Sequence, residues 1–404
     1  MRNLFICFLM ATLAALVQRG PNPVVEPATY LGLLVVFPVL GARLFRNWRL
    51  SPAVGALAAG AILSQSGLMT SGTLESVAAF KDAGFIWLGL YLGTQAARRS
   101  AWRAQTVTPA IAIVVTCSLF VCLSTSLFRL TLLEQLQIGL AAAACAPLFT
   151  MLEPQRHPEA LGLSVMSAAI AGTLLAATAV TGVMTENARA ILTAPIVLLL
   201  AVEFAFRCLR SAVSGPGRYA VLILVTATLW KTASQVGVHP ALMGLSFGFL
   251  LGLRTHRWQD TTTPLAEAST FVCPFVVGFL ASGLDWGRLV VAPAEAWTIA
   301  AAIACPMVLA KVLVGRFVGQ NVGYTAYEWL TLYPLGIAAI EVIPAVLPTR
   351  LLLGVAIQPI DAVLPTILIS TVALPLLFSW VGRWEGYFSS RRHAAASSGG
   401  IGLT

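Results

Sequence analysis

Lys311 interrupts an apolar run that extends from Ile299 to Val314. A charged side chain in apolar surroundings is costly, so ionisable residues that remain there are candidates for function. Burial disfavours the charged form of an amine. A lysine in this position could therefore release a proton, or pair with a carboxylate as the counter-ion in an exchange cycle. The alternative is an ion pair with a purely structural role.

A carboxylate, Glu341, follows Pro334 and Gly336 within the apolar run near residues 327–347. Proline removes a backbone donor and breaks a helix, which frees carbonyl oxygens of the preceding turn. Freed carbonyls and a carboxylate together could bind a cation. The alternative is that Glu341 pairs with a neighbouring helix.

A second interruption lies in the alanine-rich run near residues 137–152, at Cys145-Ala146-Pro147. Paired interruptions in the two halves of a membrane protein predict a substrate site at mid-membrane, built from two broken helices. Pro147 and Pro334 would mark these breaks. The alternative is that proline and glycine are simply common in membrane helices.

The remaining charges in apolar runs have simpler interpretations. Glu203 precedes Arg207 by four residues, a spacing that favours an ion pair along one helix. Lys231, beside Trp230, could be an interfacial anchor or a gate, and His239 is typical of a helix start. No phosphate loop, nucleophile set or metal-spaced histidine is visible, so we expect no enzymatic activity, no metal and no cofactor.

The elements that must position these residues are membrane helices. The sequence is 58% hydrophobic and 10% charged, with a mean hydropathy of +0.85. Runs of about 17–25 apolar residues without strict alternation predict helices that cross the hydrocarbon core, not barrel strands. We expect an all-α integral membrane protein of about 13 transmembrane helices. The expected spans lie near residues 28–45, 52–67, 80–97, 107–127, 137–152, 160–183, 189–209, 219–236, 240–253, 269–284, 295–318, 327–347 and 352–382.

The chain divides into three parts. Residues 1–20 predict a signal peptide, or alternatively a short extra helix, because the apolar stretch from Leu4 to Val17 is too short to span. Residues 28–385 form the transmembrane domain. Residues 386–404 predict a disordered cytoplasmic tail. The formal net charge of +9 arises from arginines in short loops between apolar runs. We therefore expect these charges to set the orientation of the helices in the membrane, and we expect no nucleic-acid partner.

Arginine is concentrated in alternate loops, which the positive-inside rule places in the cytoplasm. Two such clusters are Arg43, Arg46 and Arg49, and Arg98, Arg99 and Arg103. Cysteine labels near Arg98 should therefore react only from the cytoplasm, and labels near Ser71 only from outside. The opposite labelling pattern would contradict this orientation. We expect the chain to be a multi-pass protein of the cell's inner membrane.

Several stretches resemble the monovalent cation:proton antiporter family, the sodium/hydrogen-exchanger-like membrane transporters. The similarity follows the family's order over most of residues 28–382. It rests on Leu50–Leu63 with Ser66–Leu68, Asp82–Gly93, the central Gly237–Gly252 with its Phe249-x-x-Gly252 ending, Phe275–Leu284 and Lys311. The resemblance implies an inverted-repeat antiporter bundle with two interrupted helices, a homodimer in membrane lipid, and exchange of protons for Na⁺ or K⁺.

The sequence departs from the family where that family binds its cation. The family carries acidic residues in the helix after a Thr-x-Pro segment, but Cys145 replaces the threonine and no carboxylate occurs from Ala160 to Val183. A bare alkali cation needs hard oxygen ligands, which alanines do not supply. Antiport by alternating access is one hypothesis. The others are a non-transporting sensor or assembly protein, and an anion or organic-acid carrier that uses Lys311.

Overall fold

Helices occur at every expected span from 28–45 to 295–318 in the computed structural model of the chain. The structure describes residues 27–48, 51–66, 71–97, 104–128, 130–144, 163, 165–174, 188–211, 215–236, 239–254, 263–315, 317, 351–352, 355–356 and 364–369. The expected span 327–347, residues 1–20 and residues 386–404 lie outside these ranges.

The helices have the following bounds. They are α2 (Pro27–Asn47), α3 (Pro52–Gln65), α4 (Ser71–Ala96), α5 (Ala104–Thr125) with the short 3₁₀ helix η2 (Ser126–Phe128), α6 (Leu132–Ala143), Val165–Leu174, α9 (Ala188–Ser211), α10 (Gly215–Val236), α11 (Pro240–Arg254), α12 (Thr263–Ser282), α13 (Arg288–Val291), α14 (Ala294–Val314) and a turn at 364–367.

Local sequence explains where several helices begin. Pro52 occupies the first turn of α3, where a missing N–H costs nothing. At the start of α6, Thr131 and Glu134 form a reciprocal capping box: the Glu134 amide donates to the Thr131 hydroxyl at 3.3 Å, and the Thr131 amide donates to the Glu134 carboxylate at 2.8 Å. These caps fix the start of α6, whose other end carries the buried alanines 141–143.

Among the described residues, four helices are long and apolar enough to cross a membrane: Tyr30–Asn47, Thr106–Phe128, Leu265–Ser282 and Ala294–Val314. On α5 and the adjoining η2 an exposed stripe repeats every four residues, through Ile111, Val115, Leu119, Leu123 and Leu127. An apolar stripe on the outside of an otherwise apolar helix is what contact with lipid tails requires.

Close packing joins α4 to α11 through glycines on both helices. A Cβ atom at Gly89 or Gly93 would collide with the backbone of α11, at the carbonyls of Ala241 and Leu245 respectively. Conversely, a Cβ atom at Gly248 would collide with a backbone carbonyl of α4. Small residues four apart let two membrane helices approach to backbone contact, which gains dispersion energy along the whole interface.

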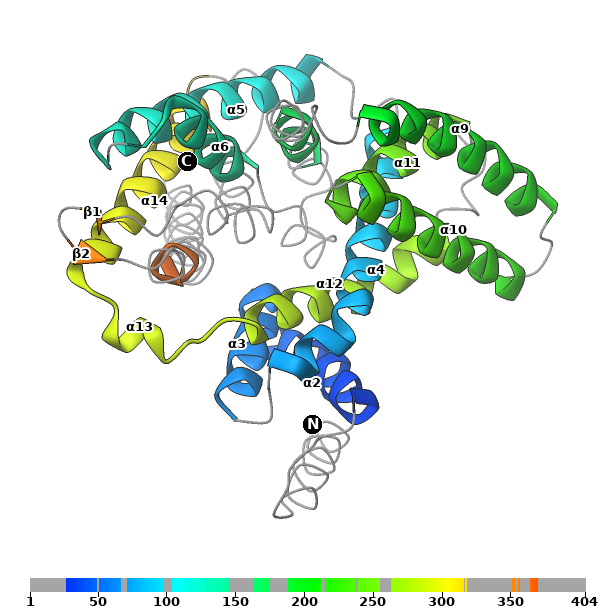
Figure 1. Cartoon of the computed structure of the whole chain (residues 1–404), viewed down its shortest axis with the longest axis horizontal. Coiled ribbons are helices and arrows are strands. Elements are labelled where there is room, and N and C mark those ends of the chain that lie inside the picture. The colour runs from blue at the N-terminus through cyan, green and yellow to red at the C-terminus, as the bar shows by residue number, and fades with distance from the viewer. Residues whose placement is uncertain are drawn as a thin grey trace, which may run out of the picture.

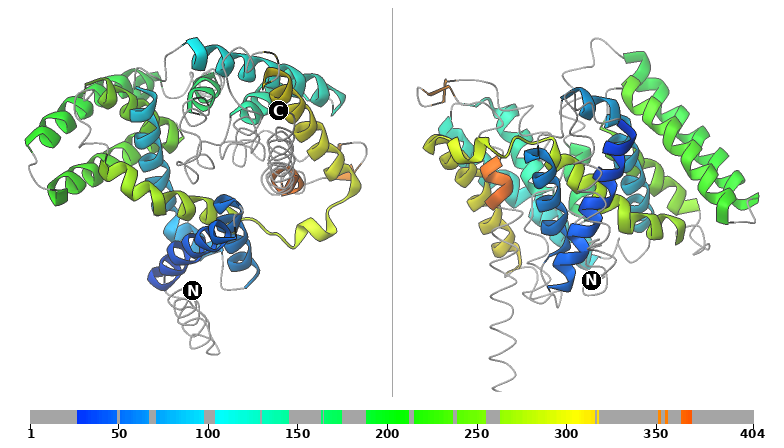
Figure 2. Two further views of the ribbon diagram at one scale, coloured as in Figure 1. Left: turned by 180° about the vertical axis from the view of Figure 1, so that it is seen from behind. Right: turned by 90° about the horizontal axis from the view of Figure 1, so that it is seen from below.

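The helices form two groups (Figure 1). In the larger group α2, α3, α4 and α12 pack together, and α11 packs against α4 and carries α9 and α10 with it. In the smaller group α14 and α6 pack against α5. Figure 2 shows the same groups from behind and from below. The short helix α13 lies on the connection from α12 to α14, so it joins the two groups.

The last expected span, 352–382, is wrong at its start. Leu351–Leu352 (β1) pairs antiparallel with Val355–Ala356 (β2), in the register Leu351 to Ala356 and Leu352 to Val355. The two residues between them in the sequence include Gly354, a residue that favours tight turns. Helix is described again at 364–367.

Candidate ion-binding site

Two hydrogen bonds set the register between α5 and α14. The Ser124 hydroxyl donates to the Ala302 carbonyl at 2.5 Å, and the Cys117 thiol lies 3.7 Å from the Met307 carbonyl. Because the residue number falls on α5 as it rises on α14, the two helices run antiparallel. The same register places Lys311, one turn beyond Met307, level with Ile113 and Val114 of α5.

Lys311 has no exposed surface. It lies on the face of α14 that also buries Ala304, Met307 and Ala310. Side chains of a helix tilt toward its N-terminus, so the lysine stem leaves the last turn of α14 in the direction of the helix centre. Because the side chain is completely enclosed, its amine does not snorkel to the surface of the bundle, which the position near the helix end would permit.

Two hydroxyl residues share this complete burial. Ser167, in the helix Val165–Leu174, and Thr366, in the single helical turn at 364–367, also have no exposed surface. Both lie in helical segments that contribute to the same hydrophobic cluster as Met307. Sequence reasoning did not select either residue. The available signal was a hydroxyl side chain within an apolar run, which many structural serines and threonines share.

The side chain of Ser118 is a further polar group inside the smaller helix group. It is 7% exposed, and its Oγ makes no hydrogen bond within the described part of the chain. Gly139 of α6 packs directly against the Ser118 backbone: a Cβ there would lie 2.8 Å from the Ser118 carbonyl. Ser118 therefore lies at the α5–α6 contact.

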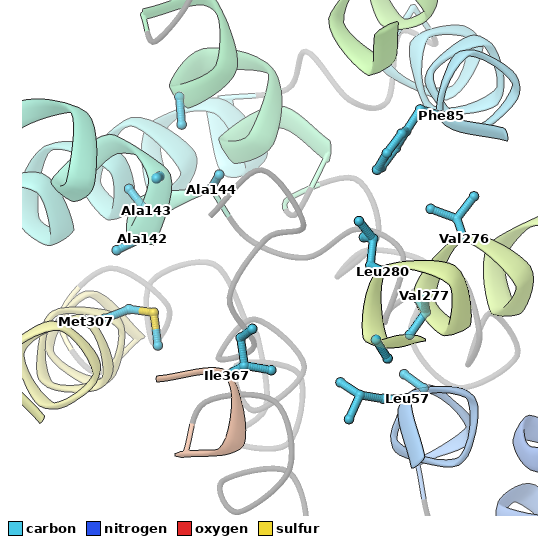
Figure 3. Close-up of a cluster of buried hydrophobic side chains, with 14 of the residues drawn as sticks. Leu57, Phe85, Ala142, Ala143, Ala144, Val276, Val277, Leu280, Met307 and Ile367 are labelled. Carbon is cyan, nitrogen blue, oxygen red and sulfur yellow. The ribbon is translucent and has the colours of Figure 1, made fainter. Parts of the chain in front are cut away.

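Side chains from both helix groups surround one central region (Figure 3). Met307 of α14 and Ala144, at the end of α6, lie on one side of it, while Leu280 of α12 and Phe85 of α4 lie on the other. All four are nearly or completely buried. Both groups thus contribute side chains to the hydrophobic cluster at the centre of the bundle.

Four of the candidate site residues, Cys145, Pro147, Pro334 and Glu341, lie outside the described residues. The structure therefore neither brings them to Lys311 nor separates them from it. In the helix Val165–Leu174 the sequence holds no carboxylate, and Ser167 is its buried polar residue.

Glu203 has the structural role that its spacing indicated. Its carboxylate lies 3.0 Å from the Arg207 guanidinium on the same helix, and 3.0 Å from that of Arg254 on α11. The two arginine side chains are 78% and 59% exposed, so this pair of bridges belongs to the surface of the bundle. Exposed bridges of this kind contribute little to stability.

Trp230, beside Lys231, contacts a distant part of the chain. Its indole N–H donates to the Asp82 carboxylate at 3.3 Å, which links α10 to α4. Lys81 lies 3.9 Å from the same carboxylate. His239 immediately precedes α11, as its helix-start interpretation predicted.

No protein-family model matches the sequence, and no curated protein matches it either. Among solved structures, the chain is similar to the sodium proton antiporter MjNhaP1 from Methanocaldococcus jannaschii. The similarity covers 88% of this chain and 97% of that chain, with a TM-score of 0.63 and 13% identity. The chain has the sodium/proton antiporter fold.

At this identity the likeness concerns the fold, and it confirms the resemblance at that level. The antiporter fold also confirms the all-α membrane architecture, so the chain is a multi-pass membrane protein. Within this fold, Lys311 is a completely buried lysine on a helix beside the central region.

Proposed function

We propose that the chain is a secondary active transporter that exchanges Na⁺ or K⁺ for protons by alternating access. It would act as a homodimer in the inner membrane of the cell. The observation that carries the proposal is a lysine with no exposed surface on α14 of an antiporter fold. A membrane protein retains so costly a residue when its charge serves a function or a necessary ion pair.

Lys311 would couple transport to protons. Taking an ammonium group out of water disfavours its charged form, and a nearby carboxylate favours it. Entry of a cation beside Lys311 would favour the neutral amine by repulsion, and its departure would restore the proton. The two ions would then use the site in alternation, as antiport requires.

Glu341 would supply the hard oxygen ligand that the helix Val165–Leu174 lacks. The proposal includes breaks at Pro147 and Pro334 that free backbone carbonyls near this carboxylate. Cys145 would lie at the first of the two breaks.

Flux through reconstituted protein tests the function. Proteoliposomes with a trapped pH dye should show proton movement when an outward or inward gradient of Na⁺, K⁺ or Li⁺ is imposed. Empty liposomes treated identically measure the leak. Proton movement no faster than this leak for all three cations would contradict the proposal.

Glu341→Gln should weaken the dependence of flux on cation concentration, because an amide keeps one oxygen but loses the negative charge. We expect the half-saturating cation concentration to rise about tenfold or more, which corresponds to a loss of about 1.4 kcal/mol of binding. Glu203→Gln is the matched control, since Glu203 lies in the surface ion pair. Equal effects of the two substitutions would exclude Glu341 as a ligand.

A second candidate is a non-transporting relative, such as a membrane sensor or assembly protein with the same fold. The absence of a carboxylate in Val165–Leu174 favours it. It predicts no flux with any cation. It also predicts that loss of the buried charge stabilises the protein, since nothing would then require that charge.

A further inference from the structure

His239 caps the start of α11 with its side chain. The His239 carbonyl accepts hydrogen bonds from the amides of Leu242, at 3.0 Å, and Met243, at 3.3 Å, which defines it as the residue before the first turn. Its Nδ1 atom accepts a further hydrogen bond, at 3.2 Å, from the Ala241 amide. One of the four amides that a helix start leaves unpaired is thus satisfied by an imidazole.

This cap exists only while His239 is neutral. A backbone N–H can only donate, so Nδ1 must carry a lone pair and the imidazole proton must be on Nε2. A protonated imidazole donates from both nitrogens, which removes the acceptor. It also puts a positive charge at the positive end of the α11 dipole, where it is unfavourable.

The elements that pack against α11 also carry charged groups. From α4 come Lys81 and Asp82, and from α10 the exposed Lys231. Glu203 of α9 instead bridges to Arg254, at the opposite end of α11.

The imidazole also supports Phe85, which faces the central region. The two rings meet edge to face, with centroids 5.0 Å apart and planes at 69°. The Lys81 ammonium lies 5.8 Å from the centre of the Phe85 ring. Phe85 is 2% exposed and extends from α4 toward the centre of the bundle (Figure 3). Movement of His239 would therefore change the packing of a side chain beside the central region.

We propose that His239 is a proton-operated latch, which holds the start of α11 and the Phe85 ring in place when neutral and releases both when protonated. The arginine asymmetry places this end of α11 outside the cytoplasm. The latch would then respond to the external pH. As a regulator of transport it rests on the proposed function, whereas the capping switch itself does not.

Hydrogen exchange of the full-length protein tests the switch. The rate of amide exchange in the peptide that begins α11 is measured at about pH 8 and at about pH 5.5, on either side of the usual pKa of histidine. The protection is the exchange rate of the unstructured peptide at the same pH divided by the measured rate. We expect the protection of the wild type to fall about fivefold at the lower pH, the factor for loss of a typical cap. Unchanged protection would overturn the proposal.

Two variants at the same position separate a cap from a general effect of pH. His239→Asn places a carbonyl oxygen that accepts at both pH values, so its protection should not fall. His239→Ala removes the acceptor, so its protection should be low at both. His256→Asn, the same substitution at another histidine, should behave like the wild type. A fall in His239→Asn equal to that of the wild type would overturn the latch.

The regulatory role needs a flux measurement. Lowering the external pH from about 8 to about 5.5 should reduce cation-driven flux in the wild type relative to His239→Asn under the same gradient. Equal pH profiles of the two proteins would overturn the role in transport. If neither protein transports, the proposed function fails, and the exchange data still decide the latch.

Discussion

Lys311→Met should reduce cation-driven proton flux to the level of empty liposomes while the protein still inserts and folds. Methionine has a similar length and an apolar chain, so it can fill the completely buried position without a cavity. It cannot bind a proton. Flux is measured in proteoliposomes, and folding is checked by the thermal unfolding midpoint of the same preparation.

Lys311→Arg distinguishes two roles of the lysine. Arginine keeps the positive charge but does not release its proton in proteins. If Lys311 binds and releases a proton, both substitutions should abolish coupling. If Lys311 is only a fixed counter-ion, Lys311→Arg should keep part of the flux. Unchanged flux in Lys311→Met would exclude any coupling role.

If the wild type shows no flux, Lys311→Met instead tests whether the buried lysine still has a role. Replacing a buried ionic group with an apolar side chain of similar volume is often neutral or stabilising, by about 1–4 kcal/mol. If Lys311→Met then raised the unfolding midpoint, the lysine would be the remainder of a lost site. That result would favour the non-transporting relative.

Gly248→Ala should destabilise the protein by about 1–3 kcal/mol, the usual cost of overpacking a tight interface. The added Cβ would collide with the Leu90 carbonyl of α4, and a backbone atom cannot move aside as a flexible side chain can. The free energy of unfolding, or the thermal midpoint in detergent, measures the effect.

Gly32→Ala is the matched control. Gly32 is also a helical glycine, but a Cβ there meets nothing within 4 Å. The change in helix propensity is the same in both variants, and by itself it favours alanine by about 1 kcal/mol. Gly32→Ala should therefore be neutral or stabilising. Similar effects of the two substitutions would contradict the close approach of α4 and α11.

Much of the architecture follows from the sequence alone. Apolar runs of membrane-spanning length predicted the helices, and Pro52 and the Thr131–Glu134 pair account for two of their starts. The four-residue spacing of Gly89 and Gly93, and of Gly244 and Gly248, is likewise visible as a packing pattern. These features are local, because each depends on residues within one helix or turn.

Contacts between residues far apart in the sequence were determined only by the tertiary structure. Trp230 and Asp82 are 148 residues apart in the sequence, so no local pattern predicts the hydrogen bond between them. The pairing of Leu351–Leu352 with Val355–Ala356 likewise lies in a stretch whose apolar composition resembles a membrane helix. In both cases apolar composition is compatible with several packing arrangements.

The environment of Lys311 shows most clearly that apolar composition does not determine packing. The sequence determined that a lysine lies within a membrane helix, in the expected span 295–318, but not whether its side chain reaches the surface or the interior. In a soluble helix, polar residues would mark the outer face and reveal the buried one. The runs around α14 are apolar on every side, because lipid tails are as apolar as a protein core. Only the packing of α5 and α6 against α14, together with the surrounding segments, decided that Lys311 is enclosed.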